Sequence, residues 1–246
     1  MKLKFLIDKK YIFLHALNQR QYNEPFKGWA RFTNSIWNKY PQEWYFLAGY
    51  AEWLIIKNNS LISVSQKAEK LLEKWLKTPQ SKQLIRETEK YRNWLEEEWR
   101  EKGGIALKEL ERIIRITLPD KTISIYVTHP KLRNGFTINP QTIAWGHKED
   151  WPNYSIVYLC HEIMHTIFWD NKSKNSHAVI ELATDNELRI RLNKKGKYFK
   201  EGKFDIGHDY LRKLEQKILP QWKNYLKNKG KKNIFKLEKE LKKVVK

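Results

Sequence analysis

Apolar and aromatic side chains recur at intervals of three and four positions through the first hundred residues. Examples are Trp44 with Leu47, and Leu72 with Trp75. This period is typical of amphipathic helices, so residues 10–102 are predicted to be helical. Gly103-Gly104 is expected to end the third long helix, since glycine is common at helix ends. We therefore predict a helical N-terminal region over residues 1–103, with the Trp-rich stripes packed as its core.

After Gly104 the pattern changes. Residues 105–116 predict one more amphipathic helix, and the β-branched run Thr122–Val127 predicts a strand. Two short apolar segments, Phe136–Ile138 and Thr142–Trp145, are expected to be further strands. Together these segments predict a small sheet, mixed or mainly antiparallel. The second domain is expected to span residues 104–246.

Helices are predicted to dominate the remainder of this second domain. Apolar positions from residue 153 indicate a helix that ends near Asp170. A polar connector precedes a second helix over His177–Leu192, with Ser176 as its N-cap. Taken with the strands, the pattern predicts an α+β fold that is mainly helical.

The C-terminal part of the chain forms a basic tail. The formal net charge is +20, and residues 191–246 carry 19 Lys or Arg against 6 Asp or Glu, a balance of +13. Two helices are predicted in the tail, at about 208–219 and 233–245. Such a tail can dock on nucleic acid, which is therefore one candidate partner. The excess of 37 Lys over 11 Arg also fits codon bias and solvated surface charge, since specific base and phosphate contacts prefer arginine.

The N-terminal apolar run, Met1–Ile7, is cut short by Asp8 and Lys9, and no small-residue cleavage site follows. We therefore interpret it as the start of a strand or helix. No apolar stretch approaches the roughly 20 residues that span a bilayer. The single cysteine, Cys160, excludes an internal disulfide framework. These observations favour the cytoplasm.

The residues that carry candidate chemistry lie within the predicted helix that ends near Asp170. The run reads His161-Glu162-Ile163-Met164-His165. Histidines four positions apart lie one helical turn apart, so both rings can reach one metal ion while Glu162 leans towards its open position. A zinc ion there lowers the pKa of water, and Glu162 can take the proton and pass it to a leaving amine. The pattern predicts a Zn²⁺-dependent hydrolase of peptide or amide bonds.

A catalytic zinc ion of this type needs a third protein ligand, and the next predicted helix offers His177, Glu181 and Glu187. Glu181 and Asp185 share one helix face, and an aspartate that accepts the second ring N–H of His161 would fix its tautomer. A solvated pairing of Asp185 with Arg189 is the alternative. Glu187 points to another face.

The segment from Glu181 to Asp185, with the preceding His-Glu-x-x-His run, resembles the zincin metallopeptidases of the thermolysin-like gluzincin type. The resemblance covers about residues 120–192. It implies a zincin-like catalytic core with an active-site helix, Glu181 as the third zinc ligand, and Asp185 as support for a ligand histidine. It also implies that the strand at Thr142–Gly146 lies at the sheet edge beside the substrate. His177 stays open as a competing ligand, because other zincins use a third histidine.

A developing oxyanion needs a hydrogen-bond donor besides zinc, and the resemblance implies a His or Tyr from later in the chain. His208 and Tyr210 are the candidates, and we assign His208. The expected function is a zinc metallopeptidase with a protein or peptide substrate. The alternative is a basic protein that binds nucleic acid or another partner, with a structural or degenerate zinc core.

Overall fold

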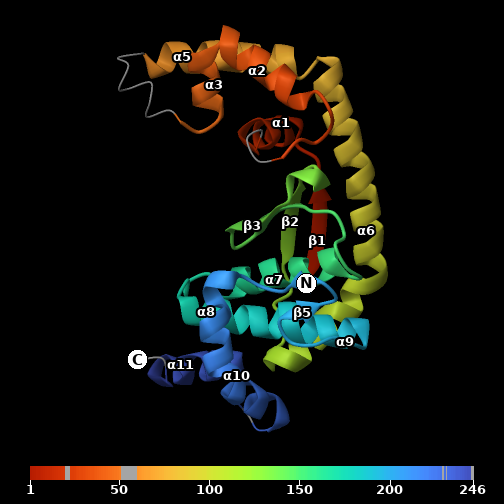
Figure 1. The fold of residues 1–246 in the computed structure, drawn as a ribbon, viewed down its shortest axis with the longest axis vertical. Coiled ribbons are helices and arrows are strands. Elements are labelled where there is room, and N and C mark those ends of the chain that lie inside the picture. Colours follow the sequence, from red (N-terminus) through yellow and green to blue (C-terminus); the bar gives the residue numbers. More distant parts are fainter. Residues whose placement is uncertain (20–22, 51–59, 229, 231, 245–246) are drawn as a thin grey trace.

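A computed structural model of the chain describes residues 1–19, 23–50, 60–228, 230 and 232–244. The molecule is mainly helical, with a four-stranded mixed sheet and a separate antiparallel strand pair, as the α+β pattern predicts. The sheet lies between helices above and below it, and one long helix runs along its side (Figure 1). The parts of the predicted N-terminal helical stretch at residues 20–22 and 51–59 lie outside the described residues.

The helices above the sheet form what we call the helical arm. They are α1 (Lys9–Asn18), α2 (Trp29–Lys39), α3 (Pro41–Leu47) and α5 (Leu61–Trp75). Asp8 caps α1 by accepting from the backbone N–H of Tyr11, and Ser60 caps α5 in the same way. Fully or almost fully buried aromatic rings, among them Phe13, Trp29 and Trp75, form the core of the arm, as predicted.

The long helix is α6 (Pro79–Ile114), and it passes through Gly103-Gly104 without a break. The predictions of a helix end at Gly103 and of a separate helix over 105–116 were therefore wrong. A contact along the helix explains the difference: the ring of Trp99, one turn earlier, folds over Gly103, where a Cβ would lie 2.6 Å from a ring carbon. The expected division between residues 1–103 and 104–246 falls inside this helix.

The sheet has the strand order β1-β2-β4-β3. Its strands are β1 (Lys2–Leu6), β2 (Thr122–Val127), β3 (Asn134–Asn139) and β4 (Thr142–Gly146). The first three in this order are parallel and β3 pairs antiparallel with β4, so the sheet is mixed, which is the first of the two predicted alternatives and not the mainly antiparallel one. The N-terminal segment is a strand, so the region predicted as helical also supplies one edge of the sheet.

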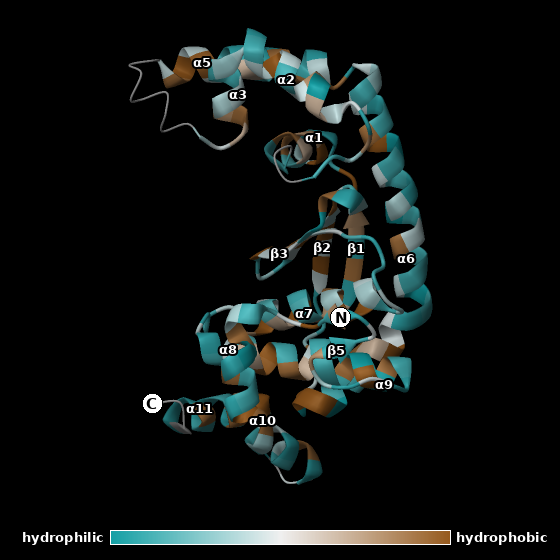
Figure 2. Ribbon diagram, in the orientation of Figure 1, coloured by the Kyte–Doolittle hydropathy of each residue, from teal (hydrophilic) through white to brown (hydrophobic). Residues whose placement is uncertain are grey.

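β4 lies inside the sheet, between β2 and β3, so the prediction that Thr142–Gly146 forms the edge was wrong. Four of its five residues are buried, which is the pattern of a strand covered on both faces. β3 forms the edge instead. Figure 2 shows hydrophobic residues along β1 and β2, whereas much of α6 is hydrophilic.

The helices below the sheet are called the basal helices. They are α7 (Tyr154–Ile167), α8 (Lys174–Glu181), the π-helical segment η3 (Leu182–Leu188), α9 (Arg189–Asn193), α10 (Arg212–Lys227) and α11 (Ile234–Val244). Three short elements lie between α9 and α10: β5 (Lys200–Glu201), β6 (Phe204–Asp205) and η4 (Asp209–Leu211). A further short helix, η2 (Pro130–Leu132), lies between β2 and β3. Among the described residues, no helix is both long and apolar enough to cross a bilayer.

Two helix boundaries differ from the prediction. α8 starts earlier than expected, because Ser173 rather than Ser176 caps it by accepting from the Ser176 backbone N–H. α10 continues beyond Pro220 to Lys227, although a helix end near 219 was predicted. Pro220 and the residue one turn before it, Gln216, are both exposed, so water can satisfy the carbonyl that the proline leaves without a donor.

Candidate metal centre

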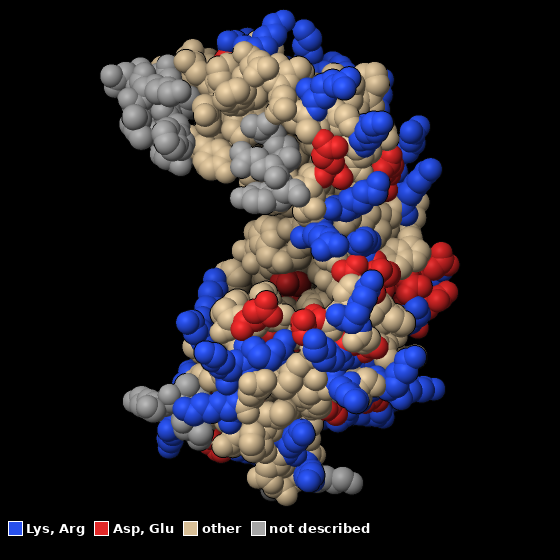
Figure 3. Space-filling view, in the orientation of Figure 1, with Lys and Arg blue, Asp and Glu red and all other residues tan. Residues whose placement is uncertain are grey.

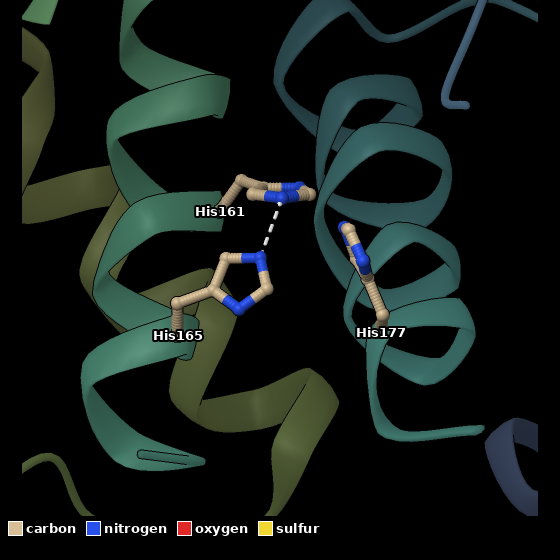
Figure 4. A group of neighbouring side chains, drawn as sticks. All are labelled: His161, His165 and His177. Carbon is tan, nitrogen blue, oxygen red and sulfur yellow. Dashed lines mark hydrogen bonds between the residues drawn. The ribbon is translucent and has the colours of Figure 1, made fainter. Parts of the chain in front are cut away.

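Three histidine side chains converge between α7 and α8. His161 and His165 project from successive turns of α7 towards α8, and His177 projects back from α8 (Figure 4). The Nε2 atoms of His161 and His165 are 3.0 Å apart. One ring nitrogen from each of the three residues lies within 4.8 Å of the others. This group could hold a metal ion.

Glu181 belongs to a second, adjoining group with His177 and His208. Its Oε1 atom lies 3.6 Å from His177 Nε2 and is hydrogen-bonded to Nδ1 of His208, while its Oε2 accepts from the His208 backbone N–H at 3.0 Å. Gly207 makes this approach feasible: it has a φ of 82°, and a Cβ there would lie 2.2 Å from Glu181 Oε2. The structure thus brings His208 beside Glu181 from a distant loop.

Asp185 lies behind His161, with its Oδ1 atom 2.8 Å from His161 Nδ1. Thr184 donates a hydrogen bond of 2.9 Å to the same oxygen. Arg189 does not pair with this carboxylate, because its guanidinium donates to the Asp185 backbone oxygen and to Glu201. Asp185 therefore orients His161 so that Nε2 faces His165.

Glu162 is buried on the same side of α7, with 6% of its surface exposed. The hydroxyl of Thr137, on edge strand β3, lies 2.8 Å from Glu162 Oε2. Burial raises the pKa of Glu162, and the attraction of His161 opposes this without cancelling it. A carboxyl group with a raised pKa beside a metal centre suits proton transfer. Sequence reasoning missed Thr137, because no local pattern shows which strand faces the helix.

The histidines differ in protonation. Burial lowers the pKa of His161, but the neighbouring carboxylates, Asp185 first, outweigh burial and raise it to about 9. Burial and the positive charge of His161 lower the pKa of His165, and the same two causes lower that of His177 to about 4. His165 and His177 are therefore neutral near pH 7, as metal binding requires. The hydrogen bond to Glu181 raises the pKa of His208.

Glu215, on α10, is a further buried carboxyl group beside Glu181. It is fully buried and accepts from Arg212 Nη1 at 3.1 Å. Burial and the nearby charge of Glu181 raise its pKa to about 9. Sequence reasoning missed this residue, although a signal existed: Glu215 lies on the apolar stripe of α10 with Ile218 and Trp222.

A cleft of about 340 Å³ opens above these groups. Its floor contains His161, Glu162 and His165, and apolar rings line part of its wall. A second hollow of about 260 Å³ continues past Glu162 on the other side, where Trp145 and Tyr158 line it. Figure 3 shows acidic atoms deep in the hollow between the helical arm and the basal helices.

The donor set fits a metal ion. Among the described residues, the buried Nε2 of His177 has no hydrogen-bond partner, and neither has the buried Oδ2 of Asp185. Buried polar atoms normally find partners, so such orphaned atoms call for an explanation. Imidazole and carboxylate ligands suit zinc and other first-row metals.

Comparisons with protein-family models, curated proteins and solved structures gave no match to this chain.

Proposed function

We propose that this protein is a zinc metallopeptidase of the thermolysin-like gluzincin kind. One observation carries the proposal: the Nε2 atoms of His161 and His165 lie 3.0 Å apart, and Glu162 is buried in the same cleft. The contact between Asp185 and His161 supports it, because metal-binding histidines usually hold a carboxylate or carbonyl with their other nitrogen.

His161, His165 and Glu181 would hold the ion, with His177 as the alternative third ligand. Two facts support different choices. His177 shares the nearer group with both α7 histidines, whereas Glu181 is the residue favoured by the sequence resemblance and is fully buried. Metal analysis of Glu181→Ala and His177→Ala decides between them. Zinc retained in Glu181→Ala but lost in His177→Ala would overturn the assignment of Glu181.

A bound zinc ion would lower the pKa of water in the cleft and polarise a substrate carbonyl. Glu162 takes a proton from the attacking water, whose oxygen forms a bond to the carbonyl carbon. Glu162 then delivers this proton to the amide nitrogen as the C–N bond breaks. His208, whose pKa is raised by Glu181, can donate a hydrogen bond to the developing oxyanion.

The substrate we propose is an extended segment of a protein or peptide. β3 has one unpaired side, and Gly135, Phe136 and Thr137 on this strand line the cleft. A peptide can add to such an edge as a further strand. The two hollows lie on either side of Glu162, which leaves room for substrate residues before and after the cleaved bond.

Glu162→Gln tests the mechanism. The variant is expected to keep its metal and to lose about 10²- to 10⁴-fold in hydrolysis, the usual contribution of a general base. Cleavage of a proteome-derived peptide library, followed by mass spectrometry, measures it without assuming a sequence preference. Glu187→Gln is the matched control, because Glu187 pairs with Arg191 and Tyr198 away from the cleft. Equal cleavage by wild type and Glu162→Gln would refute the proposal.

A second candidate function, binding to nucleic acid, is favoured by the outer face of α10. Lys213, Lys217, Lys223 and Lys227 are all exposed there, and the single acidic residue of the helix, Glu215, is buried on the opposite face. The helix is about 24 Å long at about 1.5 Å per residue. Its lysines would therefore present a row of positive charge to a phosphate backbone.

Neutralising these four lysines with glutamine tests this candidate. The slope of log K against log salt for duplex DNA should fall in magnitude by up to about 3.6, since each of four phosphate contacts contributes about 0.9. The matched control replaces four exposed lysines near the arm, Lys70, Lys74, Lys82 and Lys90, because basic side chains also spread over that region (Figure 3). Equal salt dependence in both variants would mean that α10 is an ordinary solvated surface.

A further inference from the structure

Of the group formed by His177, Glu181 and His208, the proposed zinc site uses Glu181 as a ligand. The two histidines of the group are left for another role. His208 lies far along the chain from the α7 histidines, and its ring centroid is 6.4 Å from that of His161. It is closer to His177, with ring centroids 4.9 Å apart. One donor atom from each of His177, Glu181 and His208 lies within 4.8 Å of the other two. These three residues therefore form a ligand set of their own.

We infer that the cleft holds a second divalent cation, bound by His177, Glu181 and His208. The inference rests on the proposed function only for the first ion, which His161 and His165 would hold with Glu181. Glu181 would then be shared by the two ions, and its Oε1 atom already lies beside both His177 and His208. Each ion would have two histidines and this carboxylate, and a three-ligand set leaves a position open for water or substrate.

The orientation of His177 supports this assignment. Its Nε2 atom is buried, has no hydrogen-bond partner and lies 3.6 Å from Glu181 Oε1. Its other nitrogen, Nδ1, is 3.0 Å from the hydroxyl of Tyr210. A proton on Nδ1 can thus be donated to the tyrosine oxygen, which leaves the Nε2 lone pair free to bind an ion beside Glu181.

The position of His208 supports it independently. Gly207 and the His208 backbone N–H hold this loop against Glu181, so the imidazole stays within reach of the shared carboxylate. The His208 side chain is about half exposed, which gives solvent ions access to the site. Ions that share a carboxylate are typically about 3.5–4 Å apart in two-metal sites.

Charge balance also favours a cation here. Glu181 and Asp185 are both fully buried, and the ion-pair partners of their carboxylates among the described residues are histidines. Metal binding requires those histidines to be neutral. A divalent ion beside these buried carboxylates would offset their negative charge.

Metal stoichiometry of the full-length protein tests the inference. The probe is Zn²⁺ alone, added to metal-stripped protein by equilibrium dialysis and measured by mass spectrometry. Wild type should bind two equivalents, and His208→Ala should bind one. His165→Ala should also bind one, since it damages only the first position. One equivalent in wild type, or two in His208→Ala, would overturn the second site.

Two further variants guard against a change in folding. Tyr210→Phe removes only an exposed hydroxyl and should weaken the second equivalent by about 10-fold while the first is unchanged, because it orients a ligand ring. His147→Ala is the matched control: His147 bonds Tyr154 and the Lys148 carbonyl and belongs to neither group, so both equivalents should remain. An unchanged second affinity in Tyr210→Phe would contradict the role given to His177.

The outcomes separate this inference from the proposed function. If wild type binds one ion and Glu162→Gln abolishes hydrolysis, the second site is refuted and the peptidase stands. If two ions bind and no hydrolysis depends on Glu162, the second site stands and the peptidase falls.

Discussion

The helical arm and the basal helices bury different kinds of side chain. The core of the arm is aromatic and aliphatic, with Phe13, Trp29 and Trp75 packed together. Its buried carboxylate, Glu43, pairs with Lys67 at the surface. The basal helices enclose a cluster of buried charged and titratable groups. These are His161, Glu162, Glu181, Asp185 and Glu215.

The two kinds of buried side chain have different energetic consequences. Burial of apolar rings stabilises a fold directly, whereas burial of carboxylates costs free energy unless partners or ions compensate. A cluster of buried carboxylates and histidines therefore indicates a function more strongly than an aromatic core does. The comparison predicts that substitutions in the arm change stability, while those in the basal cluster change metal binding.

The largest effect is expected from Trp29→Ala in the arm. Trp29 is fully buried, and its Nε1 donates to the Ala16 carbonyl at 3.0 Å. Its removal should lower the free energy of unfolding by about 3–5 kcal/mol, the range for large core truncations. Urea denaturation measures this loss, and zinc affinity of the folded variant should not change. Trp37→Ala, at a side chain 37% exposed, is the control and should cost less than about 1 kcal/mol. A loss of zinc affinity in folded Trp29→Ala would erase the distinction between the two regions.

Removal of metal should affect the opposite region. At about 100 times the dissociation constant, a ligand that binds only the folded state stabilises it by about 2.7 kcal/mol. Zinc should therefore slow hydrogen exchange in α7 and α8, and a chelator should reverse this. The arm helices α1 and α2 serve as the internal reference. If amide hydrogens exchange through local opening rather than global unfolding, zinc should leave the exchange rates of these two helices unchanged. Equal protection in both regions would argue for a global rather than a local effect.

Asp185→Asn should have a smaller effect that is specific to the cluster. The change keeps the size of the side chain but replaces the charged acceptor of the hydrogen bond to His161 Nδ1 with a neutral amide. Zinc affinity is expected to fall by about 10- to 100-fold, as for other residues that support metal ligands. Competition with a coloured chelator gives the ratio directly. Glu187→Gln is the control, because Glu187 pairs with Arg191 and the neighbouring Asn186 is buried. Identical affinities in Asp185→Asn and Glu187→Gln would contradict the role of Asp185.

The smallest effect concerns His15, on α1 of the arm. Burial lowers the pKa of His15 to about 4, and its Nε2 has no hydrogen-bond partner in the part of the chain that the structure describes. The folded state thus resists protonation while the unfolded state, with a pKa near 6.5, accepts it. The contribution of neutral His15 to the free energy of unfolding is fully present above pH 6.5 and is lost as the pH falls towards 4. At pH 5.5 the loss is on the order of 1 kcal/mol. The difference in unfolding free energy between wild type and His15→Phe should change by this amount between pH 7 and 5.5, and a constant difference would refute the assignment.

Local patterns predicted the elements better than their arrangement. The strand Thr122–Val127 was predicted with its observed bounds, because alternation of β-branched residues is a local signal. The helix end at Gly103 was wrong because the packing of Trp99 overrides the local preference of glycine. The edge strand was also wrong, since strand order depends on pairing between distant segments.

The candidate site shows the same limit. The spacing of His161 and His165 follows from helix geometry, and the structure places Asp185 against His161 as the sequence led us to expect. Their roles in metal binding stay predictions. Thr137 and the approach of His208 to Glu181 could not be predicted, because they depend on how a strand and a loop fold onto the helices.

The continuity of α6 has a consequence for how this chain can be divided. At about 1.5 Å per residue, its 36 residues extend about 54 Å, past the arm, the sheet and the first basal helices. Its Tyr91 and Leu95 pack with Phe5 of β1 against the sheet. A gene fragment that begins at residue 104 would omit these three side chains and the whole of β1, leaving β2 with an unpaired hydrophobic edge. Such a fragment should aggregate on expression, so a minimal fragment that carries the candidate site must retain the first strand and this stretch of helix.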